Sequence, residues 1–169
     1  MRGMMVPSLL SLGVLWGAAV PSSSAQGIPG GLRLSDSVAI ERAALQAMQL
    51  DRMREKTRLV FDESGQQRHR SDSVNAVLRG EFRLLAATDR ERGSCSPVSL
   101  DCRGLPEGTT VLDIGRLRVE DAQVVVVIRA MTTGKRLDGT PGTFGSATTL
   151  RLAKIEGEWR VIGRSMTAT

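Results

Sequence analysis

Cys95 and Cys102 are the residues of this 169-residue chain whose type and spacing most clearly indicate chemistry. An even pair of cysteines at short range in an exported protein forms a disulfide. Redox-active pairs usually have two intervening residues and one sulfur near a helix N-terminus, whereas six residues separate this pair. A metal site would need further ligands, and His69 is the only histidine. We therefore predict a structural disulfide, with redox chemistry as the alternative, and we expect no metal site.

Residues suited to catalysis are few. Asp113, inside a predicted strand, is the one candidate for a catalytic carboxylate, and Asp62 is a second acid that could face a cavity. Neither has a partner at an informative spacing. His69 lies between two arginines in a polar segment, which is typical of a solvated loop histidine. The chain has no tyrosine and no Gly-x-Ser-x-Gly sequence, so serine-hydrolase chemistry of the α/β type has no support. We lean against an enzyme and expect no cofactor.

The last predicted hairpin collects arginines on one side. A two-residue turn at 156–157 would pair residue 155 with 158, 153 with 160, 151 with 162 and 149 with 164. Period-two alternation then places four apolar side chains on one face: Leu150, Leu152, Trp159 and Val161. The opposite face receives three arginines: Arg151, Arg160 and Arg164. Such a row either keeps a sheet face soluble or binds an anionic surface, and the second reading is our binding hypothesis.

Arginine dominates the positive charge of the chain. The net charge is +5, and of the 23 basic residues only Lys56, Lys135 and Lys154 are lysines. Arginine binds carboxylates and phosphates through parallel hydrogen bonds, which favours an anionic partner, although genome base composition gives the same bias. Acids are interspersed among the arginines and only 3% of the residues are aromatic. We therefore expect no nucleic-acid partner.

The first residues have the order of a secretory signal peptide. Arg2 supplies a positive charge, Val6–Val20 form an apolar run, and small residues precede a cleavage position after residue 25. The run is shorter than the roughly 20 residues that span a bilayer, so we expect cleavage rather than a membrane anchor, and no transmembrane segment afterwards. The predicted organisation is a signal peptide over 1–25, a flexible lead-in over 26–34 and a single domain over 35–169. This predicts a periplasmic or extracellular protein.

Helices are predicted before strands along the chain. Two helices are expected, over 37–53 and 71–79, and a Ser-Asp-Ser sequence at the start of each, at 35–37 and 71–73, has side chains that can cap a helix. Gly80 is placed to end the second helix. Residues 82–86 fit either a strand or a continuation of that helix, and 90–108 is predicted to be a loop.

Strand signals dominate the second half. Strands are expected at five places: 58–61, 110–119, 123–132, 146–155 and 158–166. Residues 123–128 are almost all apolar, which predicts a central strand covered on both faces. The glycine-rich segment 133–142 is predicted to be a mobile hairpin tip. Its Gly134-Lys135 lacks the earlier glycine and the following Ser or Thr of a phosphate loop.

Helices followed by antiparallel strands, with the final Leu-Arg-Leu-Ala-Lys-Ile-Glu-Gly-Glu-Trp-Arg-Val-Ile, resemble the NTF2-like superfamily. The resemblance covers the C-terminal strands and implies a sheet that bends around a helix to form a cone. The expected fold class is therefore α+β, with N-terminal helices packed on a bent, mostly antiparallel sheet of four to six strands. Isomerases of that superfamily pair a general-base carboxylate with an oxyanion donor such as tyrosine, which this chain lacks. Fold analogy alone does not transfer a function.

Three functions follow from these observations. The first is an exported module without a catalytic set that binds a small molecule or another envelope protein. The second is an NTF2-like enzyme that uses a pocket carboxylate such as Asp113. The third is an arginine-faced module that binds an anionic envelope component. A homodimer is compatible with all three.

Overall fold

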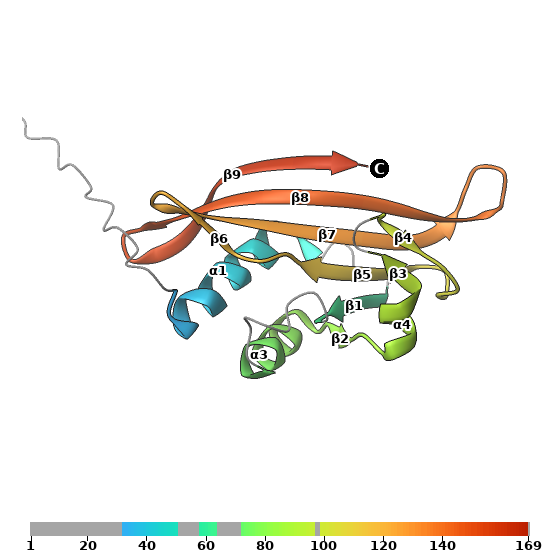
Figure 1. Cartoon of the computed structure of the whole chain (residues 1–169), viewed down its shortest axis with the longest axis horizontal. Coiled ribbons are helices and arrows are strands. Elements are labelled where there is room, and N and C mark those ends of the chain that lie inside the picture. Colours follow the sequence, from blue (N-terminus) through green and yellow to red (C-terminus); the bar gives the residue numbers. More distant parts are fainter. Residues whose placement is uncertain (1–31, 51–57, 64–71, 97–98, 169) are drawn as a thin grey trace, which may run out of the picture.

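The computed structural model describes residues 32–50, 58–63, 72–96 and 99–168, which form helices and a mostly antiparallel sheet (Figure 1). The helices are α1 (Leu34–Ala47), α3 (Asp72–Phe82) and α4 (Asp89–Ser94). The strands of the main sheet are β1 (Arg58–Asp62), β2 (Leu85–Ala86), β5 (Thr109–Ile114), β6 (Arg118–Glu120), β7 (Gln123–Lys135), β8 (Pro141–Ile155) and β9 (Glu158–Ala168). Two further strands, β3 (Cys95–Ser96) and β4 (Asp101–Cys102), form a separate pair. The α+β class is confirmed.

The main sheet has seven strands, so the prediction of four to six is wrong. Its order is β2-β1-β5-β7-β8-β9, with β6 also paired to β7; β1 is parallel to both its neighbours and the later pairs are antiparallel. Two features account for the difference. β2 has two residues, too few to show a period, and the predicted strand 110–119 divides at Gly115 into β5 and β6. There the Gly115 N–H donates to the Val127 carbonyl at 2.6 Å, and an added Cβ would lie 3.0 Å from that oxygen.

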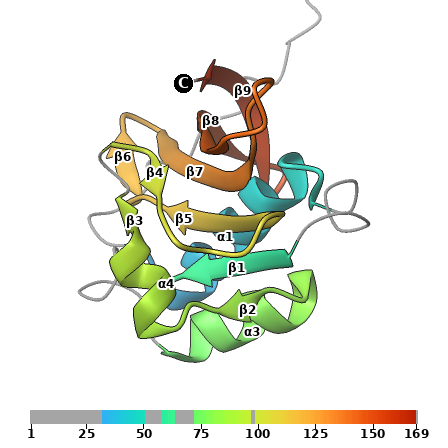
Figure 2. The ribbon, with the colours of Figure 1, turned by 90° about the vertical axis from the view of Figure 1, so that its right-hand side faces the viewer.

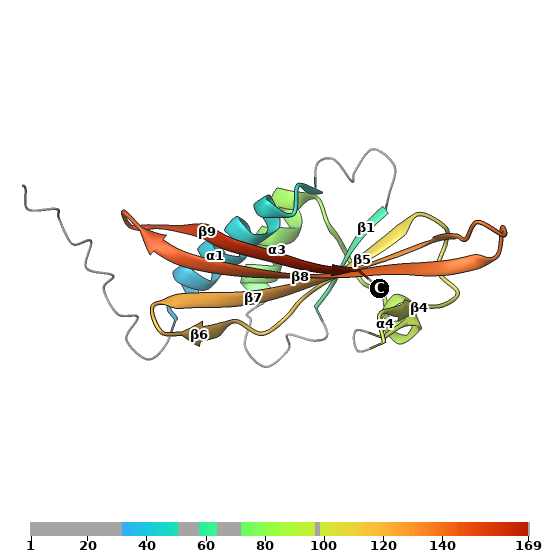
Figure 3. The same ribbon diagram turned by 90° about the horizontal axis from the view of Figure 1, so that it is seen from above.

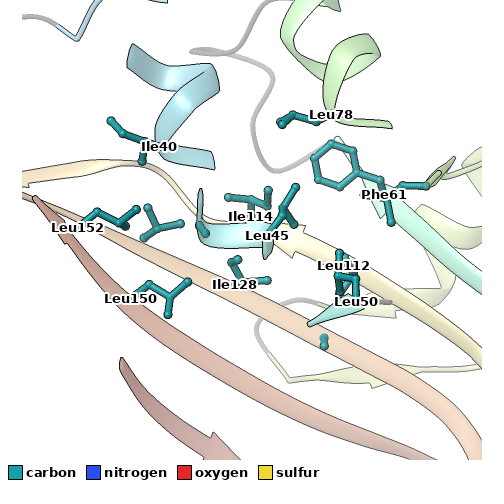
Figure 4. Packing of buried hydrophobic residues seen from close by; sticks show 14 of the residues in the cluster. Ile40, Leu45, Leu50, Phe61, Leu78, Leu112, Ile114, Ile128, Leu150 and Leu152 are labelled. Carbon is teal, nitrogen blue, oxygen red and sulfur yellow. The ribbon is translucent and has the colours of Figure 1, made fainter. Parts of the chain in front are cut away.

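One face of the sheet, which we call the inner face, packs against α1 and α3 (Figures 1 and 3). Alternate residues of β5, β7 and β8 point toward the helices, as period-two geometry requires. Fully buried members of this core include Ile40, Leu45, Phe61, Leu78, Leu112, Ile114, Ile128, Leu150 and Leu152 (Figure 4). Side chains thus fill the space between α1 and the sheet, and Figure 2 shows the strands from β1 to β9 arranged around that helix.

The opposite, outer face is covered over part of its area by α4 and the β3–β4 pair. Cys95 and Cys102 pack there on Val60, Val111 and Met131, which have no exposed surface. Met131 of β7 lies in this outer cluster, and at the other end of the strand the neighbouring residues Val124, Val125 and Val126 are all buried. The predicted central strand with cover on both faces is confirmed, although Val127 is only half-buried.

The helix ends differ from the predictions. α1 begins at Leu34, three residues early, after Arg33, whose side chain makes no capping hydrogen bond. It ends at Ala47; the predicted end at 53 lies outside the described residues, as does Ser71. Gly80 does not end α3, which continues to Phe82 before Arg83 adopts a positive φ of 48°. The undecided segment 82–86 therefore divides between the end of α3 and the strand β2.

The predicted loop 90–108 contains a helix with a complete capping box. The Thr88 hydroxyl accepts a hydrogen bond from the Glu91 N–H, and the Glu91 carboxylate accepts one from the Thr88 N–H at 2.8 Å. Arg58 of β1 also donates to this buried carboxylate. Burial would raise the pKa of Glu91, but the hydrogen bonds from Thr88 and Arg58 outweigh burial, so the pKa lies below its ordinary value. These contacts fix α4 to the sheet.

Asp36 of α1 fastens the helix to the β8–β9 hairpin. Its carboxylate accepts a hydrogen bond from the Trp159 indole N–H at 3.0 Å and binds Lys154 at 3.1 Å. The pKa of Asp36 lies below its ordinary value of 3.8, first because of the Trp159 hydrogen bond and then because of Lys154. The predicted capping role is thus replaced by a contact between helix and sheet.

Replacing Asp36 with alanine is expected to lower the free energy of unfolding by about 1–2 kcal/mol at pH 7, because Trp159 and Lys154 lose a charged acceptor. A carboxylate with a lowered folded pKa stabilises the fold above its unfolded pKa, and this contribution is lost as the pH falls through the folded value. The difference between wild type and variant should therefore shrink below about pH 4. Urea unfolding followed by Trp159 fluorescence measures it.

Glu158→Ala is the matched control, since this exposed acid pairs only with Arg160 on its own strand among the described residues. Its effect should stay within about 0.5 kcal/mol. Equal losses in the two variants, or a difference that does not change with pH, would contradict the assigned role of Asp36.

Candidate functional site

The β8–β9 hairpin has the predicted turn but not the predicted register throughout. Residue 155 pairs with 158 and 153 with 160, as expected. A β-bulge then intervenes, so Arg151 pairs with Gly163 instead of Ile162, and residue 149 pairs with Ser165 instead of Arg164. The extra residue reverses the faces of everything that follows it in β9. The predicted grouping of three arginines on one face is therefore wrong.

Arg151 and Arg160 lie on the outer face, and Arg164 lies on the inner face opposite Leu150. Each outer arginine has an acidic partner: Arg151 binds Glu120 at 3.3 Å and Arg160 binds Glu158 at 3.0 Å. The Arg164 guanidinium instead donates to the Ala47 carbonyl at the end of α1, at 3.2 Å. α1 has no basic residue in its own last turn, so β9 supplies the cation that a helix C-terminus favours.

Asp113 is buried on the outer face and is ion-paired. It is 4% exposed, and Arg129 of the neighbouring strand donates to its Oδ2 at 3.0 Å. Asp62, which is 3% exposed, occupies the paired position on the parallel strand β1. The structure thus places side by side two acids that lie far apart in the sequence. Both are enclosed within the fold, and neither lines the cleft described below. His69 lies outside the described residues.

The predicted disulfide is present. Cys95 and Cys102 are joined with an S–S distance of 2.06 Å, and the bond closes the β3–β4 pair, which we call the clip. Thr143 of β8 holds the clip on the sheet: the Cys102 N–H donates to the Thr143 hydroxyl at 3.2 Å, and that hydroxyl donates to the Cys102 carbonyl at 2.7 Å. A single side chain thus satisfies both backbone groups of one clip residue.

Thr133 of β7 does the same for the segment that follows the clip. Its hydroxyl donates to the Pro106 carbonyl and accepts from the Thr109 N–H, at 2.5 and 3.1 Å, and its own carbonyl accepts from the Gly108 N–H at 2.9 Å. Thr133 and Thr143 occupy paired positions in the β7–β8 ribbon. Two adjacent threonines on the outer face therefore hold both the clip and the returning chain.

A cleft of about 590 Å³ lies between the clip and the ends of β7 and β8 that flank the hairpin turn. One side is formed by the clip and the residues after it, from Asp101 to Leu105, and the other by the strand ends around Lys135 and Pro141. Thr133 and Thr143 line it as well. The Arg90 guanidinium braces the first side by donating to the Gly104 carbonyl at 3.1 Å.

Positive charge exceeds negative charge around this cleft. Arg103 binds Asp101 at 2.9 Å, and Lys135 binds Glu107 at 3.4 Å. Arg136 is the third cation lining the cleft, and it makes no ion pair with any residue that the structure describes. Its side chain lies over Gly142, where an added Cβ would come within 2.9 Å of the arginine Cγ. The absence of a side chain at Gly142 thus leaves room for the Arg136 side chain.

Few local features of the sequence indicate this site. The hairpin tip 133–142 is predicted only as a glycine-rich turn, and the hydrogen bonds of Thr133 and Thr143 reach residues 27 and 41 positions away. Among the described residues, no group of three or more His, Cys, Asp or Glu side chains is arranged to hold a metal ion. None of the helices in the described part of the chain has the length and apolarity that a membrane crossing requires.

Arg160 and Arg164 lie on opposite faces of β9 and should therefore differ in how much they stabilise the fold. Arg164→Ala is expected to lower the free energy of unfolding by about 1 kcal/mol, because the end of α1 loses both a hydrogen bond and a favourable charge. Arg160→Ala, an exposed ion pair on the same strand, should change it by less than about 0.5 kcal/mol. Urea unfolding at low salt measures both. An equal loss in the two variants would mean that Arg164 does not support α1.

Comparisons with known proteins leave the family of this chain open. The sequence matches no protein-family model, and no curated protein is significantly similar to it. The cleft and the residues around it are therefore the basis for inferring a function.

Proposed function

We propose that this chain is an exported, non-enzymatic binding module whose small ligand occupies the cleft between the clip and the β7–β8 hairpin. The observation that carries the proposal is that one cross-strand pair, Thr133 and Thr143, holds the clip side of the cleft on the strands that form its other side. A pre-formed cleft of about 590 Å³ is within the range of small-molecule sites. The disulfide supports export, because such bonds persist in oxidising compartments outside the cytosol.

The charges of the cleft favour a ligand that carries a carboxylate or phosphate group. Three cations and two acids surround it, and Arg136 supplies a guanidinium that is not neutralised by a described acid. A guanidinium binds carboxylate and phosphate oxygens through two parallel hydrogen bonds. Leu105 and Pro141 offer apolar surface for the remainder of a small organic anion.

The other readings have weaker support. An NTF2-like enzyme would need an acid that meets a substrate, whereas Asp113 is enclosed and bound to Arg129. An NTF2-like fold remains part of our proposal, since α1 packs on the inner face of a sheet whose last strands are long and antiparallel. An arginine-faced module would rely on Arg151 and Arg160, but Glu120 and Glu158 already bind their guanidinium groups.

Titration with citrate, a small tricarboxylate, tests the proposal by amide chemical shifts. The amides of Gly134, Gly142 and Thr143 should shift saturably, and Arg136→Ala should weaken citrate binding about tenfold, because one charged hydrogen-bonding partner is worth ~1.4 kcal/mol. Inorganic phosphate is the second probe and should shift the same amides.

Arg116→Ala is the matched control. Arg116 is exposed, lies between β5 and β6 away from the cleft, and makes no ion pair with a described residue. Its removal lowers the net charge by the same amount as Arg136→Ala but should leave citrate binding unchanged. Shifts that do not saturate, or an equal weakening in both variants, would show non-specific attraction to a basic protein and would overturn the proposal.

A further inference from the structure

We propose that the C-terminal half of β9 pairs with the same segment of a second copy of this chain, so that two sheets join edge to edge. β9 is the last strand of the sheet and has only β8 as a neighbour. No described element lies along its other edge, as Figure 1 shows, and α1 contacts β9 from the inner face. The outward-directed N–H and C=O groups of such an edge are a template for another strand. This inference does not depend on the proposed ligand.

The bulge divides β9 into a protected half and an open half. Before it, the edge carries the charged side chains of Glu158 and Arg160 and is distorted by the extra residue, Ile162. Bulges and charges are devices that keep edge strands from pairing. After the bulge, residues 163–168 pair regularly with β8 and have no proline, no lysine and no further bulge. The open half therefore lacks the protection of the first.

The side chains of the open half favour a second copy as the occupant. In an antiparallel pair centred on Met166, this residue meets its own copy, Ser165 lies opposite Thr167, and Arg164 lies opposite Ala168. The two side chains of each opposed pair then lie on the same face of the joined sheet, and no arginine lies opposite another arginine. Met166 is 63% exposed on the inner face, so pairing would bury an apolar side chain that the single chain leaves in water.

A different centre is less favourable. If the strands paired about Ile162, Arg160 of one copy would lie opposite Arg164 of the other, and the bulge would interrupt the new ladder. Like charges directly opposite each other destabilise a strand pair. The register about Met166 also leaves Arg164 with its contact to the Ala47 carbonyl on the inner side. Few residues take part, so we expect a weak dimer that forms only at high concentration.

Sedimentation velocity over a wide concentration range tests this pairing. The wild-type chain should show a concentration-dependent monomer–dimer equilibrium. Met166→Arg, which places two like charges at the centre of the pair, should raise the dimer dissociation constant at least tenfold, equivalent to ~1.4 kcal/mol. Ile162→Arg is the matched control, because Ile162 is a 47% exposed apolar residue of the same strand outside the proposed pair. It should leave the equilibrium unchanged.

A second measurement reports the register directly. In Met166→Cys the two thiols would lie across the pair, within the distance that a disulfide can bridge, and mild oxidation should give a covalent dimer. Ile162→Cys should remain monomeric under the same oxidation. A wild-type chain that stays monomeric at its highest soluble concentration would overturn the inference. So would a dimer that Met166→Arg and Ile162→Arg weaken equally, or cross-linking that does not distinguish the two cysteine positions.

Discussion

The two-sided burial of β7 is the constraint on which the rest of this structure depends. The strand pairs with β8 from Gln123 to Lys135, and its middle section has apolar side chains on both faces. Burial of that surface is favourable in proportion to its area, so both faces must be covered. α1 and α3 cover the inner face, and α4 with the disulfide clip covers part of the outer one. The cleft arises where this outer cover meets the end of the β7–β8 ribbon, so the candidate site follows from how the core is closed.

The single inserted residue in β9, Ile162, decides which β9 side chains contact α1 and which lie on the outer face. Without the bulge at Ile162, Arg164 would lie outside with Arg151 and Arg160, and the last carbonyls of α1 would lose their cation. With it, α1 is held at both ends by the last hairpin, through Asp36 near its start and through Arg164 at its end. The same bulge separates an irregular edge that carries Glu158 and Arg160 from a regular one whose single charged side chain, Arg164, binds the end of α1. One local irregularity thereby determines both helix docking and the part of the edge that is open to a partner.

The sequence predicted those features that depend on local pattern or on a few special residues. The disulfide, the turn at 156–157 and the buried strand at 123–128 are confirmed, because cysteine spacing, turn residues and an apolar run are local signals. The start of α4 had such a signal as well, since Thr88 and Glu91 have the spacing of a capping box. The bulge had none, because an alternating pattern is equally consistent with a regular strand. The cleft was also hidden, since ordinary strand threonines make its long-range hydrogen bonds.

Thr133 and Thr143 hold the clip and the chain after it on the β7–β8 ribbon, which forms the other side of the cleft. Hydrogen exchange of individual backbone amides under native conditions tests it most directly, because the N–H groups of Cys102 and Thr109 donate to these two hydroxyls. Both amides are expected to exchange nearly as slowly as those in the middle of β7, and far more slowly than the Leu137 amide at the exposed hairpin tip. Exchange of Cys102 and Thr109 at the rate of Leu137 would contradict a pre-formed cleft.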